Sequence, residues 1–157
     1  MDLFFHLSLH IATGILAGYI VWKIWGKPNV SFLAGLGGAF FIDLDHFIDY
    51  FLAFSWNFNF EYFIKGYQFL KSDKIYILFH GWEYAIIIAI LALILKKNIK
   101  AKTILLVLGI SMLFHLGADL FLNEGAKAGT YSIIYRAKNN FNLKPLVTPE
   151  HYQEHQE

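Results

Sequence analysis

The chain has 157 residues, the usual length of one domain, and 57% of them are hydrophobic, whereas soluble domains contain about 45–50% apolar residues. This composition indicates a membrane protein and argues against a soluble enzyme. The formal net charge is +1 and no basic stripe runs along the chain, so nucleic acid is not an expected partner. Cysteine is absent, which excludes disulfides and thiolate metal ligands.

Four apolar segments follow one another, and each approaches the ~20 residues that a helix needs to cross ~30 Å of hydrocarbon. They cover residues 7–25, 30–52, 75–95 and 103–122. In the third, the stretch "YAIIIAILALIL" is apolar on every face and leaves no side for water. We therefore expect an all-α fold, a polytopic membrane protein with four transmembrane helices in a single membrane-embedded helical domain over residues 1–157.

Two short links between these segments carry much of the positive charge. Residues 23–29 and 96–102 hold six of the thirteen Lys and Arg residues and no acid. By the positive-inside rule both links face the cytoplasm. We therefore expect a multi-pass protein of the cell (inner) membrane with both termini on the extracytoplasmic side.

The residues outside the four spans also contain helical patterns. Between the second and third spans, aromatic and aliphatic residues at helical spacing predict a short helix in the membrane interface, acting as an anchor or as a lid. In the polar tail, residues 123–157, the stretch "YSIIYRAKNNF" predicts a second interfacial helix before a solvated end that includes His151 and His155. The residues that form the first pattern are Phe60, Phe63, Ile64, Tyr67 and Leu70.

Ionisable side chains in the four spans converge on one layer. Counted from the cytoplasmic end of each span at ~1.5 Å per residue, they lie about 18–24 Å along the helix, near the outer end of the hydrocarbon. Helical spacing also predicts that His80 shares a face with Glu83, and His115 with Asp119. Asp49 and His6 lie about one turn further out. The residues of the layer are His10, Asp43, Asp45, His46, His80, Glu83, His115 and Asp119.

Charged groups at this depth cost a few kcal/mol each and normally have partners. No Lys or Arg lies in the layer by this count, so either carboxylates are protonated or bound cations supply the missing charge. Mixed imidazole and carboxylate ligands suit zinc, with manganese or iron as alternatives. We expect one or two ions, on the extracytoplasmic side. The expected ligands are His10, Asp45, His80, His115 and Asp119.

At these residues the chain resembles the membrane-bound metal-dependent hydrolase family, which includes the YdjM-like inner-membrane proteins. The similar pieces are "HIATG", "IDLDHFID", "FHGWEY", "FHLGADLFLN" and "YSIIYRAKNNFNL". The family is related to zinc-dependent phospholipase C, and the unit from His115 to Asp119 is similar to the H-x3-D element that holds zinc there. The third piece departs from the usual H-R-G-x-T-H-S run, so His80 stands for one of two histidines.

The expected function is a metal-dependent hydrolase that cleaves a phosphoester or acyl bond of a membrane lipid or lipid-linked small molecule through a metal-activated water. Asp43, His46 and Glu83 would be further ligands or the general acid and base. A proton or metal-ion transporter and a non-catalytic metal-binding membrane protein are the alternatives. A bis-His haem protein is disfavoured, because haem does not require so many carboxylates.

Overall fold

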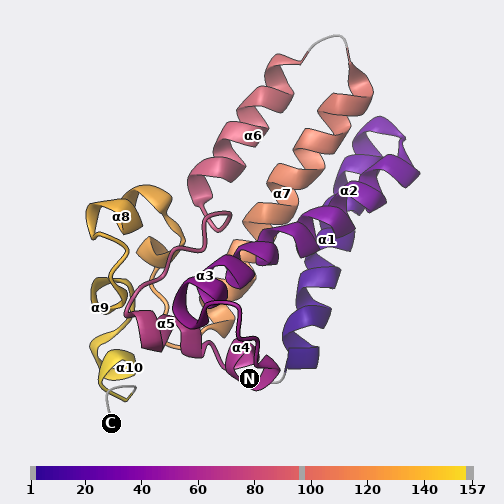
Figure 1. Cartoon of the computed structure of the whole chain (residues 1–157). Coiled ribbons are helices and arrows are strands. Elements are labelled where there is room, and N and C mark those ends of the chain that lie inside the picture. The colour runs from indigo at the N-terminus through magenta and orange to yellow at the C-terminus, as the bar shows by residue number, and fades with distance from the viewer. Residues whose placement is uncertain (1–2, 96–97, 155–157) are drawn as a thin grey trace. The chain divides into compact units, whose positions relative to one another are not determined.

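The computed structural model describes residues 3–95 and 98–154, and most of these residues are helical (Figure 1). No β-strand occurs in the described ranges. The β structure there consists of isolated β-bridges. The prediction of an all-α fold is therefore confirmed. The expectations for Lys96, Lys97 and His155 fall on residues outside the described ranges.

The chain divides into two compact units, and each unit is assembled from two separate segments. Unit 1 comprises Met1–Ile42 and Gly81–Leu122, and unit 2 comprises Asp43–His80 and Asn123–Glu157. Neither unit is a contiguous stretch of sequence, because the chain passes between them three times. The single domain expected from the chain length stays a prediction.

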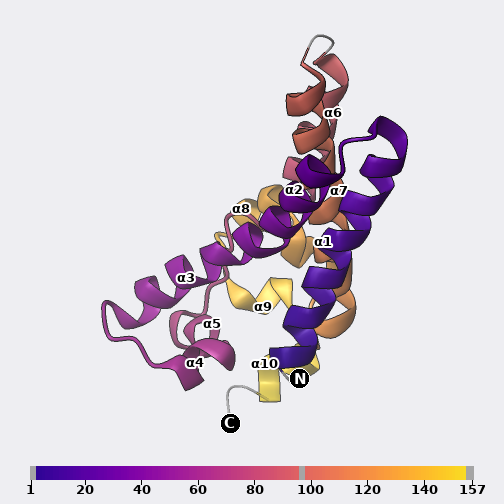
Figure 2. The same ribbon diagram turned by 90° about the vertical axis from the view of Figure 1, so that its right-hand side faces the viewer.

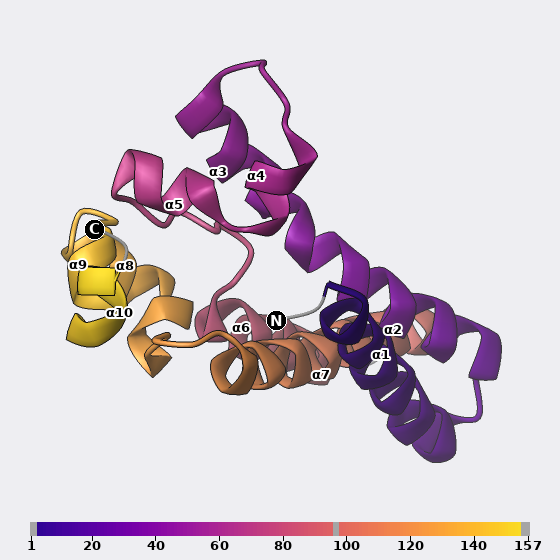
Figure 3. The same ribbon diagram turned by 90° about the horizontal axis from the view of Figure 1, so that it is seen from below.

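The described residues of unit 1 form a helical bundle. Helices α1, α2 and α7 pack against one another, and α6 packs along α7 (Figures 2 and 3). Ala17, Val21 and Val107 are buried together between α1 and α7. The bounds are α1 Leu3–Trp25, α2 Pro28–Phe41, α6 Trp82–Ile94 and α7 Ile99–Leu122.

Helices α1 and α2 approach each other closely at two glycines. A Cβ atom added to Gly14 would lie 2.5 Å from the carbonyl oxygen of Gly35, and one added to Gly35 would overlap the carbonyl oxygen of Gly14. Small residues at such crossings let helix backbones pack in contact, as is common in membrane proteins. The crossing fixes α1, which carries two of the candidate site histidines, against α2.

Three helical stretches of the described chain are long and apolar enough to cross a membrane: Phe4–Trp25, Pro28–Phe54 and Ile99–Leu122. The second runs through α2, the 3-10 helix η1 (Ile42–Leu44) and α3 (Asp45–Phe54). Helix α6 is also apolar but has only 13 residues, which is about 20 Å of helix. The structure thus supports membrane association, with three helices of full spanning length in the part of the chain that it describes.

The third predicted segment, residues 75–95, is helical only in its second part. Residues 75–81 are not helical, with a turn at residues 78–79, and α6 begins at Trp82. His80 therefore precedes the helix that contains Glu83. The prediction that these two side chains share a helix face is wrong, because the backbone before Trp82 makes its hydrogen bonds elsewhere.

Unit 2 contains α3 and several short helices. In the outer loop, the predicted helical pattern is present as two helices, and Gly66 between them has a φ of +68°, which glycine adopts without steric cost. Helix α3 packs against α5. The bounds are α4 Phe60–Ile64, α5 Tyr67–Ser72, the 3-10 helix η2 Ala128–Tyr131, α8 Ile133–Lys138, α9 Leu143–Leu146 and α10 Pro149–Glu154.

The tail is a folded part of unit 2, although the sequence predicted a short helix and a solvated end. Helix α8 forms where the pattern predicts it, and the Ser132 side chain caps it by accepting a hydrogen bond from the Tyr135 amide. Arg136 and Leu146 are fully buried, and His151 is half-buried. The tail thus contributes core residues as well as polar surface.

Candidate metal-binding sites

Each unit contains a group of histidine and aspartate side chains whose potential ligand atoms all lie within 4.8 Å of one another. The unit 1 group consists of His6, His10 and Asp119, and the unit 2 group consists of Asp43, His46 and His80. Five of their six members belong to the set expected from the sequence, and His6 was expected only at its rim.

The unit 1 group is built on α1 and α7. His6 and His10 are one turn apart on α1, and their Nε2 atoms are 2.7 Å apart. Asp119 of α7 places Oδ1 3.1 Å from Nε2 of His10 and 3.8 Å from Nε2 of His6. His10 and Asp119 are buried, whereas His6 is half-buried. Three ligand atoms from two helices thus meet at one point in unit 1.

His115 is the fourth polar residue at this point of unit 1. It lies one turn before Asp119 on α7, and its Nε2 is 3.4 Å from Oδ2 of that carboxylate. Its ring is stacked on the ring of His10, with the centroids 3.7 Å apart and the planes inclined by 14°. The i, i+4 spacing predicted that His115 and Asp119 share a helix face, and the structure confirms it.

The distances within the unit 1 group are compatible with a bound metal. Two ligand atoms on a tetrahedral zinc with bonds of about 2.05 Å lie about 3.3 Å apart. The distances of 3.1 and 3.8 Å to Asp119 lie on either side of that value, whereas the 2.7 Å between His6 and His10 is that of a hydrogen bond. Buried Nδ1 of His10 has no hydrogen-bond partner in the described part of the chain. The residues fit a metal after a small separation of the two imidazoles.

The unit 2 group is centred on His80. Its Nε2 lies 3.4 Å from Oδ1 of Asp43, and the same oxygen lies 3.8 Å from Nε2 of His46. The first distance is close to the tetrahedral edge of about 3.3 Å, and the second is about 0.5 Å longer. His80 is fully buried, while Asp43 and His46 are each about 30% exposed. The group therefore has a closed side at His80 and an open side at the other two residues.

Asp45 holds the opposite edge of the His80 ring. Nδ1 of His80 lies 3.0 Å from Oδ2 of Asp45, and the same carboxylate oxygen accepts a hydrogen bond from the Phe79 amide. The other oxygen, Oδ1, is buried and has no hydrogen-bond partner among the described residues. A carboxylate on Nδ1 fixes the tautomer that presents the Nε2 lone pair, which is the common arrangement of metal-binding histidines. Asp45 thus orients His80, and its expected role as a direct ligand stays a prediction.

His80 belongs to a non-helical segment, Ile75–His80, which we call the strap. Asp49 accepts hydrogen bonds from the amides of Tyr76 and Ile77, both at 2.8 Å. The amide of His80 donates to the carbonyl of Ile77 at 3.0 Å and closes a turn. Carboxylates of α3 therefore take amide hydrogens that an α-helix would have used, which explains why the predicted helix is absent from the strap.

The backbone of the strap is strained at Ile77. This buried residue has a φ of +28°, which is unfavourable for a β-branched side chain. Such a conformation costs on the order of 1–3 kcal/mol and persists only where the surroundings enforce it. At Ile77 they do so from both sides, since its amide donates to Asp49 and its carbonyl accepts from Arg136.

Arg136 of α8 was not recognised as a site residue from the sequence. Its side chain is fully buried, and its guanidinium donates to the carbonyl oxygens of Ile77, Thr130 and His80. The expectation that no fixed positive charge accompanies the acids is therefore wrong in unit 2. Arg136 was missed because only residues within the four apolar spans were assigned a depth in the membrane. No local pattern marks a contact between residues 56 positions apart.

Glu83 is not a member of either group. It is half-buried in the first turn of α6 in unit 1. Its predicted role as a ligand or as a general acid or base stays a prediction.

No family model, curated protein or solved structure matches this chain. The resemblance to the membrane-bound metal-dependent hydrolases consequently stays a prediction.

Proposed function

We propose that the chain is a metal-dependent membrane hydrolase that cleaves a phosphoester or acyl bond of a lipid or lipid-linked small molecule. The observation that carries this proposal is the setting of His80. Its Nδ1 faces the buried carboxylate of Asp45 at 3.0 Å, and its Nε2 faces Asp43 at 3.4 Å beside the partly exposed His46. Purely structural histidines do not need a second carboxylate and a second imidazole at the other ring nitrogen.

Zinc is the proposed ion, with manganese or iron as alternatives, because the donors are imidazole nitrogens and carboxylate oxygens. Asp43, His46 and His80 would hold an ion in unit 2, and His6, His10 and Asp119, together with His115, would hold one in unit 1. Bound in this way, zinc supplies Lewis acidity and a water whose pKa falls toward ~7. One or two ions per chain are consistent with the two groups.

The chain's own residues supply orientation and proton transfer. Asp45 keeps the proton of His80 on Nδ1, so that Nε2 remains a lone-pair donor. Asp43 and His46 are the members of the unit 2 group with solvent access, so a carboxylate or imidazole there can accept a proton from water and return it to a leaving group. Glu83 is retained as a second candidate for this role.

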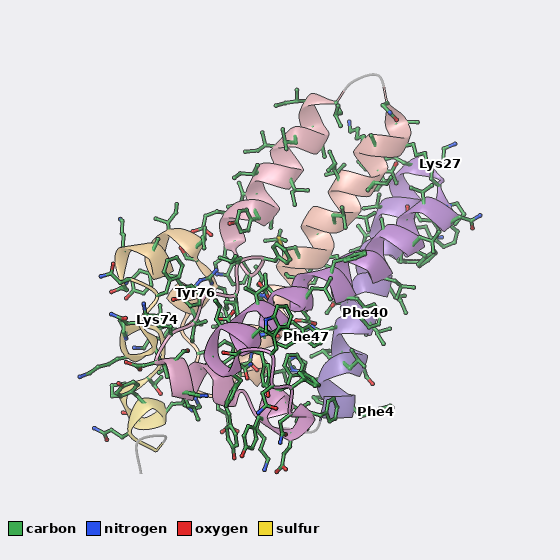
Figure 4. The ribbon with its side chains drawn as sticks, in the orientation of Figure 1. Phe4, Lys27, Phe40, Phe47, Lys74 and Tyr76 are labelled. Atoms are coloured by element: carbon green, nitrogen blue, oxygen red, sulfur yellow. The ribbon has the colours of Figure 1, made fainter. Side chains whose placement is uncertain are left out.

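The proposed substrate lies at the level of the lipid headgroups. The outer loop of unit 2 presents aromatic side chains to the surroundings, among them Trp56, which is 89% exposed, and Phe60, which is 59% exposed. Tryptophan and tyrosine are typical of membrane–water interfaces. Phe47 of α3, labelled in Figure 4, belongs to the same unit. Its ring stacks on that of Phe63 in α4, with the centroids 4.4 Å apart. These aromatic residues support a location of unit 2 at the interface.

We also propose four passages through the membrane, with the two lysine-rich links on the cytoplasmic side. Helix α6 supplies about 20 Å of the ~30 Å required. The strap, which precedes Trp82 and is not helical, would supply the remaining ~10 Å. Non-helical backbone is tolerated at membrane depth where protein groups satisfy it. The hydrogen bonds of the strap to Asp45, Asp49 and Arg136 meet that condition.

The test is hydrolysis by detergent-purified protein that is first stripped with chelator and then reloaded with a single metal. Phospholipids, a chromogenic phosphoester and acyl-ester and amide lipids form the substrate panel. We expect at least one tightly held zinc, manganese or iron per chain and turnover that returns only with the metal. The hydrolase proposal fails if metal-loaded protein turns over none of these substrates.

Proton transport is the second candidate, and one observation in unit 1 favours it. Nε2 of His6, Nε2 of His10 and Oδ1 of Asp119 form a continuous chain with steps of 2.7 and 3.1 Å, leading from a half-buried to a buried residue. Such chains relay protons in membrane transporters. Proteoliposomes with an internal pH indicator distinguish the candidates, because a transporter acidifies them without hydrolysing lipid.

A further inference from the structure

We infer that Arg136 and Asp49 are positioning residues that hold the strap, Ile75–His80, so that Nε2 of His80 faces Asp43. The inference rests on the proposed function, since it concerns the same metal-binding group. Both residues hydrogen-bond to backbone groups of the strap through their charged ends. Both act through the backbone of the strap.

Asp49 fixes the beginning of the turn that carries His80. Its Oδ1 accepts from the Tyr76 amide and its Oδ2 accepts from the Ile77 amide, each at 2.8 Å. Because one carboxylate binds two consecutive amides, the peptide plane between them cannot rotate without losing a hydrogen bond. Asp49 itself is buried on α3, one turn after Asp45. The two acids of α3 therefore hold the strap and the His80 ring from the same helix.

Arg136 fixes the two ends of the same turn from α8. Nη2 donates to the Ile77 carbonyl at 2.9 Å, and Nη1 donates to the His80 carbonyl at 2.8 Å and to the Thr130 carbonyl. The Ile77 and His80 carbonyls belong to the first and last residues of the turn closed by the His80 amide. A planar guanidinium sets their separation and direction together, which a single ammonium cannot do.

A role in packing alone would not require this arginine. Its relative exposure is 0%, and removing a cation from water is costly even when hydrogen bonds satisfy it. An apolar side chain of similar volume would fill the same space without that cost. The guanidinium additionally fixes the positions of the Ile77 and His80 carbonyls by hydrogen bonds, which helps to hold Ile77 at its unfavourable φ. The backbone of His80 is thereby held while Asp45 holds its ring.

The central test is the metal affinity of the unit 2 group, measured by chelator competition in a chain that carries His6→Ala and Asp119→Ala to silence the unit 1 group. In this background Arg136→Lys keeps the positive charge but loses the planar fork. We expect the affinity to fall about 10–100-fold, the range typical of residues that orient metal ligands. The matched control is Lys138→Gln, an exposed cation two residues along the same helix, which should leave the affinity unchanged.

A double-mutant cycle separates positioning from general stability. If Arg136 acts through His80, Arg136→Lys combined with His80→Ala should bind metal no more weakly than His80→Ala alone. A purely structural arginine would instead lower the unfolding temperature and leave the affinity of the folded fraction unchanged. That result, or additive losses in the double variant, overturns the inference.

Asp49→Asn provides an independent variant should Arg136→Lys fail to fold. An asparagine can accept only one of the two amide hydrogen bonds, so a smaller loss of affinity in the same direction is expected, and an unchanged affinity overturns the inference. Failure of the proposed function has a different signature: metal affinity depends on Arg136, but no substrate is hydrolysed. The inference alone fails if the wild type hydrolyses substrate and Arg136→Lys binds metal normally. A wild type that holds no metal contradicts both.

Discussion

His80 lies between two aspartates of α3 and η1, and the two contacts differ in kind. Asp45 is fully buried and meets Nδ1 at 3.0 Å, while Asp43 is about 30% exposed and meets Nε2 at 3.4 Å. The buried contact fixes the tautomer and the ring plane. The partly exposed contact places a solvent-accessible carboxylate beside Nε2. The same residue type thus serves two purposes a few residues apart, because the local burial differs.

Asp45→Asn tests the contact at Nδ1. The amide has nearly the same volume and does not raise the burial cost, so the variant should still insert and fold. Without the negative charge the proton is no longer held on Nδ1, and we expect hydrolysis to fall at least ~100-fold, about 3 kcal/mol of transition-state stabilisation. Turnover by purified, metal-loaded protein is the measurement. Wild-type turnover in the variant would remove Asp45 from the mechanism.

His115→Ala and Asp119→Ala test the unit 1 group. Both side chains project from one face of α7 toward His10, with Asp119 3.1 Å from its Nε2. Each change should lower the metal content per chain in elemental analysis, with the larger loss for Asp119, which supplies the only negative charge of the group. Glu150→Ala, an exposed acid of α10, is the control and should change nothing. Unchanged metal content in Asp119→Ala would argue that the unit 1 group transfers protons and does not bind a metal.

At this scale the sequence predicted pairs within one helix and missed contacts between distant residues. His115 and Asp119 share a face because an unbroken helix fixes the direction of residues four apart. Arg136 contacts the backbone of a residue 56 positions earlier, and no periodicity encodes such a contact. The charge of Arg136 did not indicate its burial either, because an arginine in a polar tail is usually solvated.

Among the elements, the strap and α6 show how far apolar composition determines structure. Residues 75–95 read as one apolar span, yet the first seven are not helical. Their amides donate to acceptors elsewhere in unit 2: Asp49 for residues 76 and 77, and Asp45 for residue 79. Acceptors 27 to 34 positions away decide the outcome, so a local pattern could not predict it. The three other spans lack such competition over most of their length and are helical, apart from the 3-10 turn at η1.

Helix packing in unit 1 gives a prediction with an internal control. Gly35→Ala adds a Cβ that overlaps the carbonyl oxygen of Gly14, so α1 and α2 must separate. Overpacking of this kind typically costs about 1–3 kcal/mol, and we expect a lower unfolding temperature in detergent. Gly117→Ala is the matched control, since a Cβ there meets no atom within 4 Å and alanine favours a helix interior by about 1 kcal/mol. Equal effects of the two changes would contradict the close crossing.

For the whole molecule, composition predicted an all-α membrane protein, and the structure agrees as far as three helices of spanning length. Neither composition nor length revealed that the chain forms two units, each made of two segments. Units of this kind depend on contacts between segments far apart in sequence. What composition does offer at this scale is a prediction of orientation, because the two links hold six of the thirteen basic residues and no acid.

Cysteine labelling tests that orientation, and the chain suits it because it contains no cysteine of its own. Ile99→Cys lies at the exposed start of α7 and leaves every lysine of its link intact, whereas Glu61→Cys lies on α4 of the outer loop, where the glutamate is 64% exposed. At the opposite end of unit 1 from Phe4, Lys27 marks the other basic link (Figure 4).

By the positive-inside rule, a membrane-impermeant maleimide should label Glu61→Cys in intact cells and Ile99→Cys only after the membrane is opened. Replacing Glu61 removes an exposed ion pair with Lys65, and solvent-screened pairs contribute little to stability, so the fold should tolerate the change. The reverse pattern would place the lysine-rich links outside the cell and move the proposed substrate to the inner leaflet. Labelling of both cysteines in intact cells would place residues 61 and 99 on the same side of the membrane. That result would contradict an odd number of membrane passages between them.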